Sequence, residues 1–187
     1  MKIRLAVIFL CVAVIFCASP AARADSFTFG VLPVGGAISG PPGSTIGWGY
    51  TFTNQSATSW LVLTAVSADV FLNGTPDASV FNFPILAPGD TLSQAYDPAN
   101  FLGLFQLTWD STAPVGFTNS GLFVVSGEWW DGDPFAGGQL LGAADDQSAA
   151  YSAAVTPVAT VPEPATLALL AIGLAALRLR RHRQRGR

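Results

Sequence analysis

The side chains that could do chemistry in this sequence are almost all carboxylates. Eleven of the twelve acidic residues lie between Asp25 and Thr160, and this stretch contains no Lys, Arg, His or Cys. It therefore cannot form a Ser–His–Asp triad, a cysteine nucleophile, a Schiff-base lysine or an imidazole-ligated metal site. We expect a middle region without catalytic residues, and a chain that is not an enzyme.

Carboxylates still allow a calcium site. Asp131 and Asp133 flank a glycine, and Asp145 and Asp146 follow a short distance along the chain. These four side chains are candidate ligands for Ca²⁺, which takes roughly six to eight oxygen ligands in proteins. The spacing departs from an EF-hand loop because no Glu closes it, so a solvated acidic turn is the simpler interpretation. No other cofactor is expected.

Carboxylates and aromatic rings also allow carbohydrate chemistry. Glu128 and Asp131 are the best-placed pair for glycoside cleavage, although residues three apart on a strand point to opposite faces. Trp130 is a candidate for stacking on a sugar ring, and Tyr96 is a second one. The simpler interpretation is the end of a strand, with Trp129 in the core and its two neighbours facing outward.

The charge of the middle region limits its partners. Its acidic residues and lack of bases give it a formal charge of about −11, whereas the whole chain carries −3 because the basic residues lie near its ends. Such a region repels polyphosphates, so nucleic-acid binding is excluded. Cations and uncharged partners remain compatible with it.

The N-terminal end has the pattern of a signal peptide. Two basic residues precede an apolar run over residues 5–17, and Ala22 and Ala24 form a small-x-small cleavage site. We expect signal peptidase to remove residues 1–24, so that the mature chain begins at Asp25. Both cysteines of the chain lie inside the apolar run, so the mature domain has no disulfide.

The C-terminal end combines a proline motif, an apolar run and a basic tail. Residues 165–179 predict a single transmembrane helix, about 22 Å long at 1.5 Å per residue, which flanking arginines could extend by snorkelling. The basic cluster should stop transfer and stay in the cytoplasm, which places the middle region outside the membrane. The arginines of this membrane stop are Arg178, Arg180, Arg181, Arg183 and Arg185.

These three features together resemble the PEP-CTERM sorting signal, over residues 161–187. The sorting motif itself is Val161, Pro162, Glu163 and Pro164. The resemblance implies recognition by an exosortase, an integral-membrane cysteine transpeptidase that would cleave near the prolines. It also implies delivery to the cell envelope or extracellular matrix of a bacterium that makes exopolysaccharide.

Period-two alternation of aromatic and β-branched residues predicts an all-β middle domain. Turn residues separate seven to nine short strands, which favours an antiparallel, immunoglobulin-like β-sandwich over residues 25–152, with a linker at 153–160. The expected strands lie around residues 27–31, 46–52, 60–66, 81–85, 101–109, 123–129 and 151–155.

The sequence thus predicts an exported surface or extracellular-matrix protein in which the β-domain has a structural or adhesive role. A secreted carbohydrate-binding or carboxylate-based glycoside-cleaving domain is the main alternative. A calcium-stabilised adhesin is the third. A Trp-lined groove would favour the second alternative, and a cluster of three carboxylates would favour the last.

Overall fold

The computed structural model describes residues 25–159. The predicted signal peptide, transmembrane helix, sorting motif and basic tail lie outside the described residues. Within them the chain forms strands and one short 3₁₀ helix, so the all-β prediction is confirmed. The elements are β1 (Phe27–Leu32), β2 (Ala37–Gly40), β3 (Thr45–Asn54), β4 (Trp60–Ala68), β5 (Gly74–Asp77), β6 (Ile85–Leu86), β7 (Thr91–Gln94), β8 (Phe105–Trp109), β9 (Thr118–Trp130), η1 (Pro134–Ala136), β10 (Leu140–Ala143) and β11 (Gln147–Val155).

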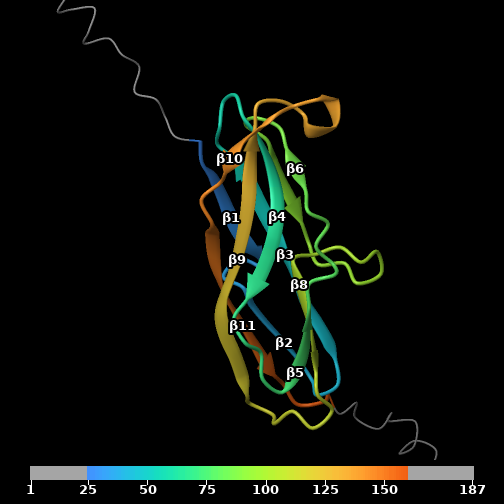
Figure 1. Cartoon of the computed structure of the whole chain (residues 1–187). Coiled ribbons are helices and arrows are strands. Elements are labelled where there is room, and N and C mark those ends of the chain that lie inside the picture. The colour runs from blue at the N-terminus through green and yellow to red at the C-terminus, as the bar shows by residue number, and fades with distance from the viewer. Residues whose placement is uncertain (1–24, 160–187) are drawn as a thin grey trace, which may run out of the picture. The chain divides into compact units, whose positions relative to one another are not determined.

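The strands form two sheets (Figure 1). The first sheet has the order β1-β3-β8-β5, and β7 pairs with the other half of β3. The second has the order β2-β11-β9-β4-β6, and β10 pairs with the end of β9. The long strand β9 lies between β4 and β11 and organises the second sheet, as Figure 1 shows.

The core lies between the two sheets and is built largely of aromatic rings. Trp48 of β3 is fully buried, and its ring centroid lies 5.1 Å from that of Phe123 on β9 and 5.4 Å from that of Tyr151 on β11. The indole N–H of Trp48 donates to the backbone oxygen of Gly36 at 2.7 Å, so its single polar atom is satisfied. Period-two alternation supplies these rings because every second residue of each strand faces the other sheet.

Three details differ from the sequence prediction. The described residues contain eleven strands rather than seven to nine, because β2, β5, β7 and β10 are short and lack an alternating apolar pattern. The sheets are not wholly antiparallel, since β2 pairs parallel with β11. The domain also extends past residue 152, because β11 continues to Val155 and the side chains of Ala153 and Val155 are buried.

Parts of two expected strand segments, at residues 81–85 and 101–109, are loops instead. Phe83 and Phe101 have positive φ angles of 49° and 55°, and their side chains are exposed. A left-handed backbone cannot continue a strand. Only Ile85–Leu86 and Phe105–Trp109 of the two expected segments form strands.

Within residues 25–159 no helix is long and apolar enough to cross a membrane. The transmembrane helix predicted at residues 165–179 is therefore neither supported nor contradicted by the described structure.

Candidate functional site

The outer face of the second sheet carries a row of apolar side chains near one end. Trp60 on β4 is paired with Trp130 on β9, and Trp130 is paired in turn with Leu140 on β10. Residues paired across antiparallel strands share a face of the sheet. Both indoles are partly exposed and Leu140 is 54% exposed. We call Trp60, Trp130 and Leu140 the tryptophan row.

The neighbouring positions on β9 follow the alternation expected from the sequence. Trp129 is buried and stacks edge-on against Phe27 at 6.3 Å, whereas Glu128 and Trp130 are partly exposed on the other face. Glu128 is paired with Val62 of β4, two residue pairs along from the tryptophan row. The outer face therefore combines flat apolar rings with one carboxylate.

The indole nitrogen of Trp130 has no hydrogen-bond partner although the atom is buried. A buried N–H without an acceptor costs about 1–3 kcal/mol. Protein atoms cover this nitrogen, so its N–H is not presented to a ligand. The tryptophan row thus offers a stacking surface.

The acidic residues proposed as calcium ligands are used in local turns. The Asp133 carboxylate accepts from the backbone N–H of Phe135 at 2.9 Å and caps η1. The Asp131 carboxylate accepts from the backbone N–H of Gln139 at 2.6 Å, which closes the loop between β9 and β10. Both carboxylates therefore stabilise the loop between β9 and β10.

Asp145 and Asp146 lie in the connection between β10 and β11, where both are exposed. Throughout residues 25–159, no three Asp, Glu, His or Cys side chains are grouped closely enough to hold a metal ion. The structure thus does not bring together the cluster that would favour a calcium site.

The pair proposed for glycoside cleavage is divided between two environments. Glu128 lies within β9 on the outer face, and Asp131 lies just beyond the strand, hydrogen bonded to the main chain of its own loop. The bond from Gln139 holds the Asp131 carboxylate in the loop between β9 and β10, away from the strand face that carries Glu128.

A polar network on the outer face of the first sheet was not predicted from the sequence. The Tyr96 hydroxyl donates to Gln106 Oε1 at 2.9 Å, and Gln106 Nε2 donates to Asp77 Oδ2 at 2.8 Å. The backbone N–H and hydroxyl of Ser79 both donate to Asp77 at 2.8 Å. Tyr96 is thus committed to this network and is less available for sugar stacking than its sequence position indicated.

Hydrogen bonds change the ionisation of this network. The backbone N–H of Ser79 is the main cause that lowers the pKa of Asp77, and the Gln106 amide and the Ser79 hydroxyl add to it. Burial raises the pKa of Tyr96, and the negative charge of Asp77 adds to that effect. Asp77 therefore stays ionised and Tyr96 stays neutral over the physiological range.

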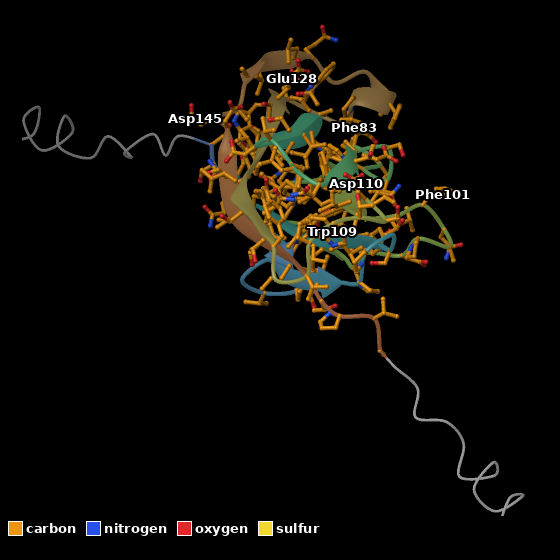
Figure 2. All side chains as sticks on the ribbon, turned by 90° about the horizontal axis from the view of Figure 1, so that it is seen from below. Phe83, Phe101, Trp109, Asp110, Glu128 and Asp145 are labelled. Carbon is orange, nitrogen blue, oxygen red and sulfur yellow. The ribbon has the colours of Figure 1, made fainter. Side chains whose placement is uncertain are left out.

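A shallow groove lies at the start of β1, beside the connection that follows β10. Its volume is about 290 Å³. Two carboxylates from distant parts of the sequence, Asp25 and Asp145, line it together with the edge of Trp129. Figure 2 shows Asp145 close to the end of the ribbon where the described chain begins. Sequence spacing gave no sign of this groove, because about 120 residues separate the two carboxylates.

The comparisons identify only the C-terminal segment. Residues 160–184 match the PEP-CTERM protein-sorting motif family. No curated protein matches the chain. The resemblance found in the sequence is therefore confirmed for the sorting segment, and it concerns that segment rather than the β-domain.

The presence of this motif has direct consequences for the route of the chain. A PEP-CTERM protein is exported and passes through the membrane, and an exosortase-type enzyme processes it. The sorting motif at residues 161–164, the arginines of the membrane stop and the alanines at positions 22 and 24 all lie outside the described residues.

Proposed function

We propose that this chain is the precursor of a non-enzymatic protein of the cell envelope or exopolysaccharide matrix, in which the β-domain has a structural or adhesive role. The PEP-CTERM match at residues 160–184 is the observation that carries the proposal. Signal peptidase removes residues 1–24, and the helix at 165–179 with its arginine cluster holds the intermediate in the membrane. Exosortase then cleaves near Pro162 and Pro164 and releases the domain.

The composition of the β-domain supports a role without catalysis. Between Asp25 and Thr160 it contains no Lys, Arg, His or Cys, so its hydroxyls have no imidazole or amine base to activate them. Its formal charge of about −11 keeps released copies apart and soluble. An acidic, compact domain of this kind is compatible with a hydrated matrix that contains few phosphate groups to repel it.

The sorting step is tested by the mass of the chain in its native cells. With exosortase present, the recovered protein should begin at Asp25 and end near Pro162–Pro164. In cells without the enzyme, it should retain Arg187. The variant Glu163→Ala should behave like the enzyme-free cells, and Thr160→Ala serves as the matched control. Equal masses with and without exosortase would contradict the proposal.

We also propose that the domain has the immunoglobulin-like arrangement. The order β1-β3-β8-β5 opposite β11-β9-β4 supports this, because it corresponds to the A-B-E-D and G-F-C sheets of such domains. In that correspondence β7 and β8 together form strand E, since both pair with β3. The strands β2, β6 and β10 are additions to the seven-stranded scheme.

The tryptophan row favours a second candidate function, which is carbohydrate binding. Sugar rings present C–H groups that stack on indoles, and hydroxyls that would donate to Glu128. Trp60 and Trp130 lie on paired positions of neighbouring strands, so one extended saccharide could contact both. The charge of the domain favours a neutral polymer over an acidic one.

Affinity electrophoresis in gels containing dextran, β-glucan or galactomannan tests this function. Binding should retard the mature chain, and Trp130→Ala should abolish the retardation. Leu122→Ala is the matched control, because Leu122 is 45% exposed on the same face of β9 and lies away from the tryptophan row. If no polymer retards the chain, or if both variants behave alike, the tryptophan row has no role in binding these sugars.

A further inference from the structure

The groove beside β1 has two carboxylates in its lining and no basic side chain to balance them. Asp25 and Asp145 supply the charges. The rest of the lining is Trp129, Leu141, Gly142 and Ala143. Residues 25–159 contain no Lys, Arg or His, so no side chain in the described part of the chain could neutralise the groove.

The first residue of the described chain is held firmly at this groove. The Asp25 carboxylate accepts from the hydroxyls of Ser56 and Ser59, at 2.5 and 2.7 Å. The next residue is held as well, because the backbone N–H of Gln55 donates to the backbone oxygen of Ser26 at 2.9 Å. These bonds hold Asp25 at the rim of the groove that Asp145 also lines.

Removal of the signal peptide changes the charge of that nitrogen. In the precursor it is a neutral amide, and cleavage after Ala24 converts it to an α-ammonium group. Because residues 25–159 have no basic side chain, this ammonium would be the only cation attached to the folded domain. It would arise at the groove whose two carboxylates have no cationic partner within residues 25–159.

We propose that the groove is the binding site for the mature chain's own α-ammonium group, which pairs there with the carboxylate of Asp145. This inference rests on the proposed signal-peptide cleavage after Ala24. The pairing locks the start of β1 onto the connection between β10 and β11, and it forms only after processing. The precursor therefore has a less stable domain than the mature protein, which favours export before the fold is complete.

The pairing predicts a definite pH dependence. An α-amino group ordinarily has a pKa of about 7.7–8.0, and neighbouring carboxylates raise it. A raised pKa in the folded state means that the contribution is fully present below about pH 8 and is lost as the pH rises through the raised value. Salt should weaken it, because the groove is open to solvent.

Because the sequence has no lysine after position 2, the α-amine of the mature chain can be modified selectively. A chain spanning residues 25–187, released from a fusion so that it begins at Asp25, has its α-amine as its only primary amine. An amine-specific acetylating reagent therefore modifies this group alone. We expect acetylation to lower the melting temperature in low salt by about 1–3 °C, the range for one partly exposed ion pair in a domain of this size.

Two variants of neighbouring residues distinguish pairing from a general charge effect. Asp145→Asn should abolish the difference between the free and acetylated chains. Asp146→Asn removes the same charge one residue later, at a side chain that does not line the groove, and should preserve the difference.

The rate of acetylation as a function of pH gives a second readout, since only the neutral amine reacts. It should report a pKa above 8 in the unmodified sequence and a lower value in Asp145→Asn. An unchanged melting temperature on acetylation, or equal effects of the two variants, would overturn the pairing. Failure of the cleavage itself is a separate result, because the mass of the exported chain would then show that the chain begins at a residue other than Asp25.

Discussion

The ring of Tyr96 occupies the space where a side chain of Gly47 would lie. A Cβ atom built on Gly47 would come within 2.5 Å of Tyr96 Cδ2 and 2.6 Å of Cζ, closer than real Cβ contacts. The segment leading to this ring also crosses over Gly49, whose Cβ would meet the backbone at Ala95. The two glycines that alternate with Trp48 and Tyr50 on β3 thus make room for the chain between β7 and β8.

This contact predicts that Gly47→Ala destabilises the domain. The added methyl group must displace Tyr96 and break its hydrogen bond to Gln106, at a cost of about 1–3 kcal/mol. The measurement is the free energy of unfolding from urea titration. Gly30→Ala is the matched control, because Gly30 also lies within a strand of the first sheet and its Cβ would meet only one atom, at 4.0 Å.

A rescue experiment separates this clash from a loss of backbone freedom. In the Tyr96→Ala background the clash is gone, so Gly47→Ala should cost nothing further. If Gly47→Ala is equally costly with and without the Tyr96 ring, the ring is not the reason for the glycine.

The sequence predicted the long strands well because their alternation directly reflects burial. In β3, β8 and β9 most of the large apolar residues at alternate positions are buried, and these strands overlap the segments that the pattern indicated. The same pattern was misleading at Phe83 and Phe101, which fit the period-two spacing but are exposed in loops. Alternation records residue type, and it cannot show whether the tertiary structure offers that residue a partner.

Short edge strands were missed for a different reason. The segment Gly74–Asp77 has the composition of a turn, yet it forms β5 at the edge of the first sheet. Pro76 is tolerated there because one side of an edge strand needs no N–H donor. Backbone pairing with β8, rather than side-chain pattern, makes this segment a strand.

The candidate sites depend on register and long-range contacts, which a single sequence does not contain. Trp130 was singled out, but its pairing with Trp60 requires the register of β4 against β9. That register is further shifted by an irregularity between Leu63 and Ala65. The groove that joins Asp25 to Asp145 similarly requires the fold, because each carboxylate alone resembles the other exposed acids.

A buried asparagine provides a second stability prediction. Asn54 is 0% exposed, and its Nδ2 donates to the backbone oxygens of Ser59, Leu86 and Ala87, while its Oδ1 accepts from the Ser56 N–H. Asn54→Leu leaves several of these groups unsatisfied, and we expect a loss of about 2–4 kcal/mol.

The neighbouring Gln55→Leu is the control for the Asn54 prediction, since Gln55 is exposed and its side chain accepts a single hydrogen bond, from Ser26. Chemical denaturation of both variants provides the comparison. A loss below 1 kcal/mol for Asn54→Leu would mean that water replaces the amide.

Acid stability should depend on Asp77. Its pKa is lowered in the folded domain, chiefly by the hydrogen bond from the Ser79 backbone N–H. A lowered folded pKa means that the stabilisation is present above the unfolded value of about 3.9 and is lost as the pH falls through the folded value. Asp77→Asn should therefore flatten the fall in melting temperature below pH 4.

The control for Asp77 is Asp110→Asn, which removes the same charge at an exposed side chain that contributes no side-chain hydrogen bond in the described structure. If the melting temperature falls equally below pH 4 in both variants, the hydrogen bonds to Asp77 do not determine the acid stability of the domain. Asp77→Asn should also loosen Gln106, whose amide donates to the carboxylate, and exchange of that amide can be followed by NMR.

Alkaline stability should depend on Tyr50 in the opposite sense. Burial raises its pKa, and its hydroxyl donates a hydrogen bond to Asn82 at 2.7 Å. Because the folded pKa lies above the ordinary value of about 10, folding favours the neutral phenol, and stability falls as the pH rises through the folded value.

Tyr50→Phe should cost about 0.5–1.5 kcal/mol at neutral pH, through the lost bond to Asn82, and should reduce the decline in stability above pH 10. Phenolate absorbance recorded alongside circular dichroism provides the measurement: ionisation of Tyr50 should coincide with unfolding, whereas a phenolate signal near pH 10 in a folded domain would show that the Tyr50 hydroxyl is open to solvent.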